Sequence, residues 1–210
     1  MFISLCYGVS IMPTEFFDDR LNWDERFMAN ALLVAMGSSC LMRRVGAVIV
    51  KDKRVIGSGY NGAAPGVTSC REKGKCLRKE MEIESGRDKD YCQALHAEMN
   101  SILNAGGRSG CNGNVMYSTT FPCTNCSKSI LGAGIDTLYY LGEYDREEFS
   151  LSDYTLKQGK VKIIKVDETS LDKICSCFEE LDSHIKSYNF RLINRDKYLP
   201  KNDIGNKQAT

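Results

Sequence analysis

Apolar and polar residues alternate along this chain with two different periods, one typical of amphipathic helices and the other of buried strands. Between residues 22 and 39, apolar side chains recur at helical spacing behind Asp24 and Glu25, and an acidic first turn favours a helix. The next two apolar runs, 45–51 and 53–60, are short and rich in β-branched residues. They predict a hairpin of buried strands.

The second half of the chain continues this alternation. Helical spacing predicts a helix that starts at Gln93 and stops before the glycine-rich segment 105–110. The elements predicted after it are, in order, a strand at 114–120, a helix from Pro122 through Leu131, a strand at 135–142, a helix at 151–158, a strand at 160–166 and a helix at 170–188. Strands that alternate with helices indicate a layered α/β fold.

The pattern divides the chain into three parts: an N-terminal extension at 1–21, one domain at 22–168, and a C-terminal helix with a polar tail at 169–210. A chain of 210 residues suits one domain with a substantial core. One polar stretch, 62–91, is too long for a simple loop in a compact domain. We therefore expect this segment either to have a function or to be held in place by an added constraint.

Composition narrows the possible partners and the compartment. The formal net charge is +1, so no bulk attraction to nucleic acid or to an anionic membrane is visible. No apolar run is long enough to cross a bilayer, and the apolar first twelve residues lack the basic region and cleavage site of a secretory signal. We expect a cytoplasmic protein without nucleic-acid or membrane partners. Its ten cysteines then indicate metal ligation or buried thiols rather than disulfides.

The strongest chemical motif is "PCTNC", which places Cys123 and Cys126 three residues apart at the predicted start of a helix. Residues at i and i+3 share a helix face, and a helix N-terminus favours the thiolate form that binds metal. Alone, this motif fits a buried thiol pair or a redox site equally well. His96 adds a third ligand, and two thiolates with one imidazole are typical of catalytic zinc with an open fourth position.

Glu98 lies two residues after His96, a spacing at which side chains do not face each other along a helix. If both residues lie in the first turn, however, their side chains lean toward the helix N-terminus and can approach one ion beyond that end. Glu98 would then carry protons for the water at the open position. The alternative is an ordinary solvated carboxylate near a helix start. "HAE" followed by "PCTNC" matches the H-x-E and P-C-x-x-C signature of zinc-dependent nucleobase deaminases.

Residues 22–166 resemble the deoxycytidylate (dCMP) deaminase family, through "VGAVIV", "GYNG", "HAEMN" and "PCxxC" in that order, with a long insertion after "GYNG". The resemblance implies a three-layer fold, with a central five-stranded mixed sheet flanked by helices, and makes 22–168 a deaminase domain. It implies that His96, Cys123 and Cys126 bind zinc and that Glu98 shuttles protons. The implied reaction converts dCMP to dUMP, a precursor of thymidylate, with release of ammonia.

The resemblance also implies substrate contacts. Asn61 would contact the sugar, although Tyr60-Asn61-Gly62 also reads as an ordinary turn. The other expected contacts are Ala97, Thr119 and Phe121. A phosphate must also be held, for which Arg108 or the pair Arg43 and Arg44 are candidates, although surface arginines are usually just solvated. Phe121 departs from the family, where a small or polar residue is common, and it would either line the pocket or pack.

Family members are commonly hexamers activated by dCTP and inhibited by dTTP, and the region after "GYNG" is the expected place for such regulation. Some relatives carry a second, structural zinc, for which the candidate ligands here are Cys40, Cys70, Cys76 and Cys92. Their spacing matches no standard zinc finger, so inert thiols are the alternative. The thiols of Cys111, Cys175 and Cys177 are interpreted as ordinary.

Two other functions compete with this interpretation. The first is a deaminase with another substrate, namely dCTP, cytidine or adenosine in tRNA; the near-neutral charge disfavours tRNA, and the insertion disfavours the short free-nucleoside type. The second is a non-catalytic zinc module. Glu98 discriminates against that module, because a structural zinc site has no need of a proton carrier.

Overall fold

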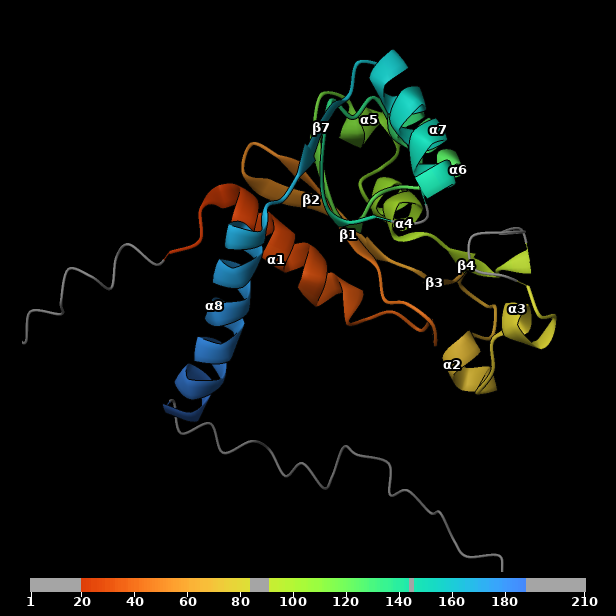
Figure 1. The fold of residues 1–210 in the computed structure, drawn as a ribbon, viewed down its shortest axis with the longest axis horizontal. Coiled ribbons are helices and arrows are strands. Elements are labelled where there is room, and N and C mark those ends of the chain that lie inside the picture. The colour runs from red at the N-terminus through yellow and green to blue at the C-terminus, as the bar shows by residue number, and fades with distance from the viewer. Residues whose placement is uncertain (1–19, 84–90, 144–145, 188–210) are drawn as a thin grey trace, which may run out of the picture. The chain divides into compact units, whose positions relative to one another are not determined.

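A computed structural model describes residues 20–83, 91–143 and 146–187 (Figure 1). The predicted extension up to residue 19 and the polar tail from residue 188 lie outside the described residues. The chain separates into two compact units, Met1–Ile174 and Cys175–Thr210, and the division falls inside the last helix. The elements that position the site belong to the first unit.

Five strands form one mixed sheet in the order β2-β1-β5-β6-β7. β1 pairs antiparallel with β2 and with β5, whereas β5, β6 and β7 run parallel. The strands are β1 (Gly46–Lys51), β2 (Arg54–Tyr60), β5 (Val115–Thr120), β6 (Thr137–Gly142) and β7 (Lys162–Lys165). The predicted central five-stranded mixed sheet is confirmed.

The described helices occur largely where helical periodicity predicted them. They are α1 (Trp23–Ala35), α2 (Cys70–Lys73), α3 (Leu77–Glu80), α4 (Ala97–Asn104), α5 (Arg108–Cys111), α6 (Thr124–Ala133), α7 (Arg146–Gln158) and α8 (Glu168–Ser187). α1 begins with a reciprocal pair of hydrogen bonds between Asn22 and Glu25, so its start is defined by local chemistry. No helix in these described ranges is both long and apolar enough to cross a membrane.

β1 and β2 form the predicted hairpin. The two residues between them, Asp52 and Lys53, both have positive φ (48° and 59°), as a two-residue type I′ turn requires. Across the hairpin, Gly46 pairs with Tyr60. The start of β1 therefore lies beside the end of β2, where the predicted substrate residue Asn61 follows.

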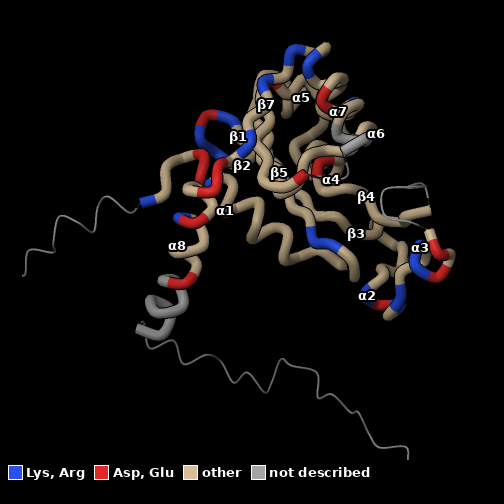
Figure 2. Tube along the Cα trace, in the orientation of Figure 1, with Lys and Arg blue, Asp and Glu red and all other residues tan. Residues whose placement is uncertain are grey.

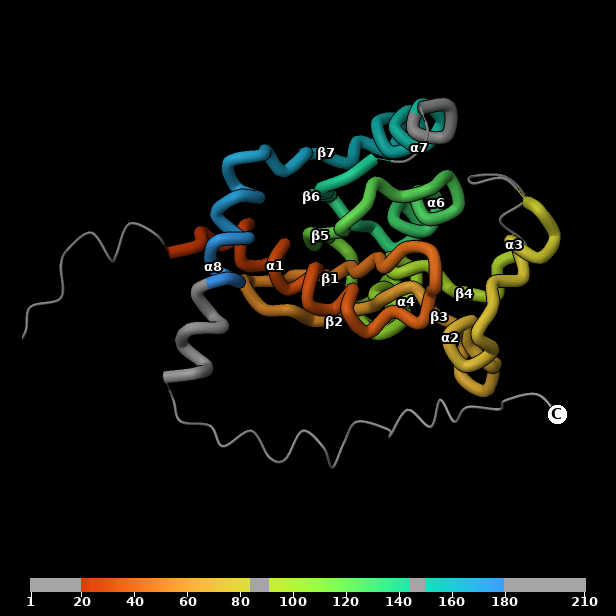
Figure 3. The backbone as a smooth tube through the Cα atoms, turned by 60° about the horizontal axis from the view of Figure 1, so that its bottom comes forward, coloured from red at the N-terminus to blue at the C-terminus, as the bar shows by residue number. Residues whose placement is uncertain are grey.

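Helices α1 and α4 cover opposite faces of the sheet (Figure 3). A side chain at Gly46 would collide with the backbone of α1, and one at Gly59 would collide with the backbone of α4. Gly46 pairs with Tyr60 and Ala47 pairs with Gly59, and successive strand residues point to opposite faces, so the two helices lie on different sides. The predicted three-layer arrangement is confirmed.

The main core lies on the α4 side of the sheet and joins three strands to four helices. Its buried members include Ile49, Met116 and Leu138 from the sheet, Ile102, Ile130 and Leu156 from α4, α6 and α7, and Cys111 from α5. Because α4 and α6 share this core, their first turns are held in a fixed relation. The site described below lies at those turns.

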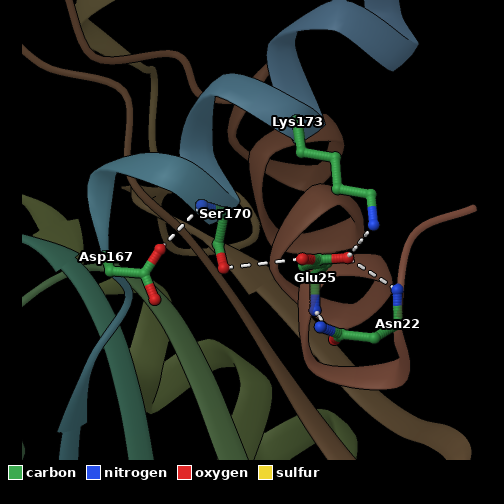
Figure 4. Close-up of polar contacts among 5 residues, drawn as sticks. All are labelled: Asn22, Glu25, Asp167, Ser170 and Lys173. Carbon is green, nitrogen blue, oxygen red and sulfur yellow. Dashed lines mark hydrogen bonds and ion pairs between the residues drawn. The ribbon is translucent and has the colours of Figure 1, made fainter. Parts of the chain in front are cut away.

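The first turn of α8 is bound to the first turn of α1 (Figure 4). The Ser170 hydroxyl lies 3.5 Å from one carboxylate oxygen of Glu25, and Lys173 Nζ lies 3.7 Å from the other. Asp167 accepts a hydrogen bond from the Ser170 backbone N–H at 2.7 Å, which orders this turn. Glu25 is buried, so it ties α8 to α1 as well as closing the start of α1.

Three predicted helix starts were wrong. The helix expected at 151–158 begins earlier, at Arg146. The helix expected from Gln93 begins at Ala97, because Ala94 and Leu95 form a short strand, β4 (Ala94–Leu95), instead. The helix expected to begin at Pro122 begins at Thr124, with Cys123 as its N-cap. Before α4 and α6 the chain therefore stays extended for longer than its hydrophobic pattern predicted.

The insertion is closed at its base by a two-stranded ribbon. β3 (Gly62–Ala63) pairs antiparallel with β4, so Gly62 lies opposite Leu95 and Ala63 opposite Ala94. Between these strands, α2 and α3 carry both basic and acidic residues (Figure 2). The stretch that was too long for a simple loop therefore contains two short helices and its own closing ribbon.

Candidate active site

His96 and Glu98 are placed by the first turn of α4. His96 is the N-cap residue, in extended conformation (φ −72°, ψ 155°), and Glu98 lies within the helix. His96 is thus one residue outside the helix, rather than in its first turn as the sequence predicted. Side chains two residues apart within a helix do not face each other, but His96 lies outside the helix and this restriction does not apply to it. Its ring can therefore approach a point beyond the helix end that Glu98 also reaches.

Cys123 and Cys126 are placed in the same way by α6. Cys123 is the N-cap residue and Cys126 lies in the first turn. The backbone N–H of Ser127 donates to the Cys123 carbonyl at 2.8 Å, which fixes this turn. Both thiols are buried, with 4% and 3% of each residue exposed.

The three predicted ligands meet at one point. His96 Nδ1 lies 3.4 Å from Cys123 Sγ and 3.3 Å from Cys126 Sγ, and the three ligand atoms lie within 4.8 Å of one another. Zinc bonds of ordinary length at tetrahedral angles separate a nitrogen from a sulfur ligand by about 3.5 Å. This donor set therefore fits a zinc ion, and it leaves the fourth tetrahedral position to another group.

The thiols are electronically prepared for a cation. A hydrogen bond from the Cys126 thiol lowers the pKa of Cys123 to about 3, and His96 contributes in the same direction against the effect of burial. The same hydrogen bond, followed by burial, raises the pKa of Cys126. A bound cation would favour the thiolate form of both residues.

Glu98 is a buried carboxyl beside this group, with 3% of the residue exposed. Burial raises its pKa, while the nearby His96 acts in the opposite direction. A carboxyl that binds a proton more readily than usual, next to a cation site, is suited to accept and return protons. The predicted neighbourhood of Glu98 and the three ligands is thus present in the structure.

Three of the predicted substrate residues converge on the start of β1. Asn61 Oδ1 accepts a hydrogen bond from the Val45 N–H at 2.8 Å, and Thr119 Oγ1 accepts one from the Gly46 N–H at 3.1 Å. Ala97 is fully buried and packs against Val45. Since Ala97 directly follows His96, this group of residues lies next to the three ligands.

Asn61 also organises the loop before β1. Its Nδ2 donates to the Arg43 carbonyl at 2.9 Å, and the buried Ser38 hydroxyl lies 2.7 Å from its Oδ1. Ser38 was missed by sequence reasoning, since a serine beyond a helix end gives no signal for a contact 23 residues away. A side-chain amide nitrogen carries two hydrogens, so Asn61 retains one for a ligand beyond this bond.

Phe121 packs, which was one of its two predicted alternatives. Only 1% of the residue is exposed, and its ring meets Tyr140 edge-on with 4.8 Å between centroids. Arg108 does not join the site. Its guanidinium donates to the Gly132 carbonyl near the last turn of α6, whereas the ligands lie at the first turn of that helix.

Of the four remaining candidate cysteines, Cys70, Cys76 and Cys92 lie in the insertion, and Cys40 lies in the loop between α1 and β1. Burial and then the neighbouring Cys76, Cys40 and Cys92 raise the pKa of Cys70, so the four thiols lie within electrostatic range. Cys70, Cys76 and Cys92 line a cavity of about 270 Å³. Among the described residues, only the His96 group brings three ligand atoms within 4.8 Å.

Comparison with known proteins agrees with this geometry. The family model of the cytidine and deoxycytidylate deaminase zinc-binding region matches residues 21–142. The deoxycytidylate deaminase of Schizosaccharomyces pombe is 41% identical over 133 residues, which are 63% of this chain and 41% of that protein. The ComE operon protein 2 of Bacillus subtilis is 36% identical over 157 residues, which are 73% of this chain and 77% of that protein. The match thus spans about two fifths of the yeast relative and about three quarters of the bacterial one.

A solved structure has the same fold. The crystal structure of dCMP deaminase from the cyanophage S-TIM5, in complex with dCMP and dUMP, superposes with a TM-score of 0.54 at 27% sequence identity. The match covers 74% of this chain and 99% of the phage protein. The sheet and its flanking helices therefore have the same fold as that phage enzyme.

Proposed function

The chain belongs to the cytidine and deoxycytidylate deaminase family, and from that premise we propose that it hydrolyses dCMP to dUMP and ammonia. The observation that carries the proposal is the group of His96, Cys123 and Cys126 with the buried carboxyl of Glu98 beside it. The phage enzyme with the same fold binds dCMP and dUMP, which supports a deoxynucleotide substrate. The product would supply thymidylate synthesis.

The site residues divide the chemistry between them. Zinc held by the two thiols and the imidazole would supply a Lewis acid that activates a water molecule for attack at C4 of the cytosine ring. Glu98 takes the proton from that water and delivers it to N3 of the ring. It then takes the second proton from the oxygen now bonded to C4 and passes it to the amino group, which leaves as ammonia while that oxygen becomes the carbonyl of dUMP. A raised pKa makes Glu98 a stronger base, which favours the transfers in which it accepts a proton.

Recognition of the nucleotide falls to the residues around the start of β1. We propose that Asn61 binds the sugar through its remaining amide hydrogen and that Ala97 and Thr119 complete the wall of the pocket. Arg43 and Arg44 directly precede Val45, to which Asn61 binds, so they replace Arg108 as the phosphate candidates. Phe121 supports the pocket through its packing on Tyr140.

The substrate is tested by measuring ammonia release on dCMP, dCTP, deoxycytidine and an RNA hairpin. We expect dCMP to be the best substrate and the hairpin to be inert, consistent with a net charge of +1. Activity on the hairpin alone would overturn the proposal. An absence of turnover on all four substrates would favour a non-catalytic zinc module instead.

We also propose a second, structural zinc at Cys40, Cys70, Cys76 and Cys92. The support is that Cys70, Cys76 and Cys92 line one cavity, that burial and then the neighbouring thiols raise the pKa of Cys70, and that a polar insertion needs something that orders it. Elemental analysis should give two zinc ions per chain and one in Cys76→Ser. Cys111→Ser, which changes a buried thiol elsewhere, should keep both. A wild-type content of one zinc per chain would contradict this proposal.

Finally, we propose a hexamer that dCTP activates and dTTP inhibits. The β3–β4 ribbon supports a regulatory role of the insertion, because Asn61 directly precedes β3 and His96 directly follows β4. Exposed apolar side chains in and after α1, namely Leu33, Met36, Leu41 and Met42, are consistent with contacts between copies of the chain. Light-scattering mass and dCMP turnover, each measured with and without dCTP and dTTP, test both claims. A monomer with turnover that ignores both nucleotides would refute them.

A further inference from the structure

α4 is fastened to β2 by two asparagine side chains one helical turn apart. Asn100 Nδ2 donates to the Tyr60 carbonyl at 2.8 Å, and Asn104 Nδ2 donates to the Ser58 carbonyl at 2.7 Å. Four helical residues rise by about 6 Å, and two strand residues span about 6.6 Å. The donors on α4 and the acceptors on β2 are therefore spaced by similar distances. Together the two hydrogen bonds oppose a slide of α4 along β2.

Two glycines of β2 allow this attachment. A Cβ atom at Gly59 would lie 2.4 Å from the Ser101 nitrogen and 2.5 Å from the Ala97 oxygen, and one at Gly57 would lie 2.5 Å from the Ser101 oxygen. The backbone of α4 thus rests directly on the backbone of β2. The two elements overlap in the view of Figure 3. At this separation a side chain as short as asparagine spans the gap.

The same helix carries half of the candidate active site. His96 is its N-cap and Glu98 lies in its first turn, whereas Cys123 and Cys126 are carried by α6. A slide or rotation of α4 would therefore move the imidazole and the carboxyl together relative to both thiols. Zinc tolerates ligand distances only within about 0.2 Å of their ordinary values, so a small displacement is enough to weaken the site.

We propose that Asn100 is a positioning residue for the zinc site. Its hydrogen bond to the Tyr60 carbonyl fixes where the first turn of α4 places His96 and Glu98. Asn104 makes the same kind of bond one turn farther from the site and anchors the other end of the helix. This inference rests on the proposed function for its catalytic consequence, but its effect on metal binding is independent of any activity.

The test compares Asn100→Ala with Asn104→Ala. Each variant removes one hydrogen bond from the same helix to the same strand, so thermal melting should show similar losses of stability. Asn100→Ala should weaken zinc binding about 10- to 100-fold in competition with a chelator, as removal of supporting contacts around a metal site typically does. It should lower kcat on dCMP by a similar factor with little change in KM. Asn104→Ala should change zinc affinity and kcat by less than about threefold.

Two further variants separate hydrogen bonding from volume. Asn100→Asp keeps the shape but replaces the donor with a carboxylate that repels the Tyr60 carbonyl, so it should bind zinc no better than Asn100→Ala. Asn100→Gln keeps the amide and should recover part of the zinc affinity. The ligand-field absorption of the cobalt-substituted protein should change in Asn100→Ala and stay unchanged in Asn104→Ala.

Equal zinc affinity and equal kcat in Asn100→Ala and Asn104→Ala, with both less stable than wild type, would overturn the proposal and leave a purely structural role. If Asn100→Ala does not fold, the comparison of Asn100→Gln with Asn104→Gln decides the same question through zinc affinity. If the wild type does not turn over dCMP, the proposed function fails, while the zinc affinities still decide this inference.

Discussion

His96 and Cys123 share an unusual placement, since both occupy the N-cap position of a helix. Side chains at this position usually accept a hydrogen bond from the helix backbone, but neither of these residues caps its helix in that way. Each directs its ligand atom toward the other instead. The positive ends of two helix dipoles therefore meet at the site, where they stabilise thiolates.

Cys123→Ser should separate the two roles of this position. Serine is a strong N-cap and would accept a hydrogen bond from the backbone of α6. Without metal, the free energy of unfolding of Cys123→Ser should therefore be about 1 kcal/mol higher than that of Cys126→Ser. Both variants should lose tight zinc binding. Denaturant titrations in the presence of a chelator measure the first effect, and elemental analysis measures the second. If the two variants were equally stable without metal, the missing cap at Cys123 would not lower the stability of the fold.

Glu98→Gln tests the proton carrier. The amide keeps the shape of the buried side chain but cannot accept and return a proton, so turnover of dCMP should fall about 10²- to 10⁴-fold while zinc content stays at the wild-type value. Asp172→Asn is the control, because it also replaces a carboxylate by the corresponding amide, but at an exposed position on α8. Near-normal turnover in Glu98→Gln, measured as ammonia release, would refute the assigned role.

The ligand set was predictable because each residue sits in a short motif with fixed spacing, so the geometry depends only on a helix end. Arg108 was a poor prediction for the opposite reason. Its distance from the site depends on how α5 packs against the last turn of α6, which no local pattern records. Asn61 lies between these cases: its turn is visible in the sequence, but its bonds to Arg43 and Val45 are not.

The contact between α4 and β2 depends on glycine because the two backbones touch. Gly59→Ala would place a Cβ atom 2.4 Å from the Ser101 nitrogen, and overpacking of this kind should lower the free energy of unfolding by about 1–3 kcal/mol. Gly132→Ala is the matched control, since a Cβ there meets nothing within 4 Å and lies within α6. It should raise stability by about 0.5–1 kcal/mol. Equal effects in denaturant titrations would contradict the close contact.

Helices and strands were predicted well where one face is apolar throughout, as in β1 and α1. Two of the errors fell at the helix ends that carry the ligands. There the sequence keeps its helical spacing through Leu95 and Pro122, but pairing with β3 and the N-cap geometry of Cys123 hold the chain extended. Local propensity and tertiary pairing compete at such positions, and only the structure shows which prevails.

The metal should also stabilise the fold, because its ligands join two separate helices. Zinc at a thousandfold excess over its dissociation constant would add about 4 kcal/mol, or about 10 °C in melting temperature for a domain of this size. Melting curves with and without a chelator should show this difference in wild type and in Glu98→Gln. Cys126→Ser should show little of it. A wild-type melting temperature that does not respond to the chelator would contradict the fit of the donor set.

The ribbon of β3 and β4 has a consequence for how this chain could vary. Since Gly62 pairs with Leu95 and Ala63 with Ala94, the segment between them enters and leaves the domain at one point. The distance that any replacement segment must bridge is therefore set by two paired strands and does not depend on the segment's own length. We therefore expect that another segment can be grafted between β3 and β4, beside His96 and Asn61, without a change in the central sheet.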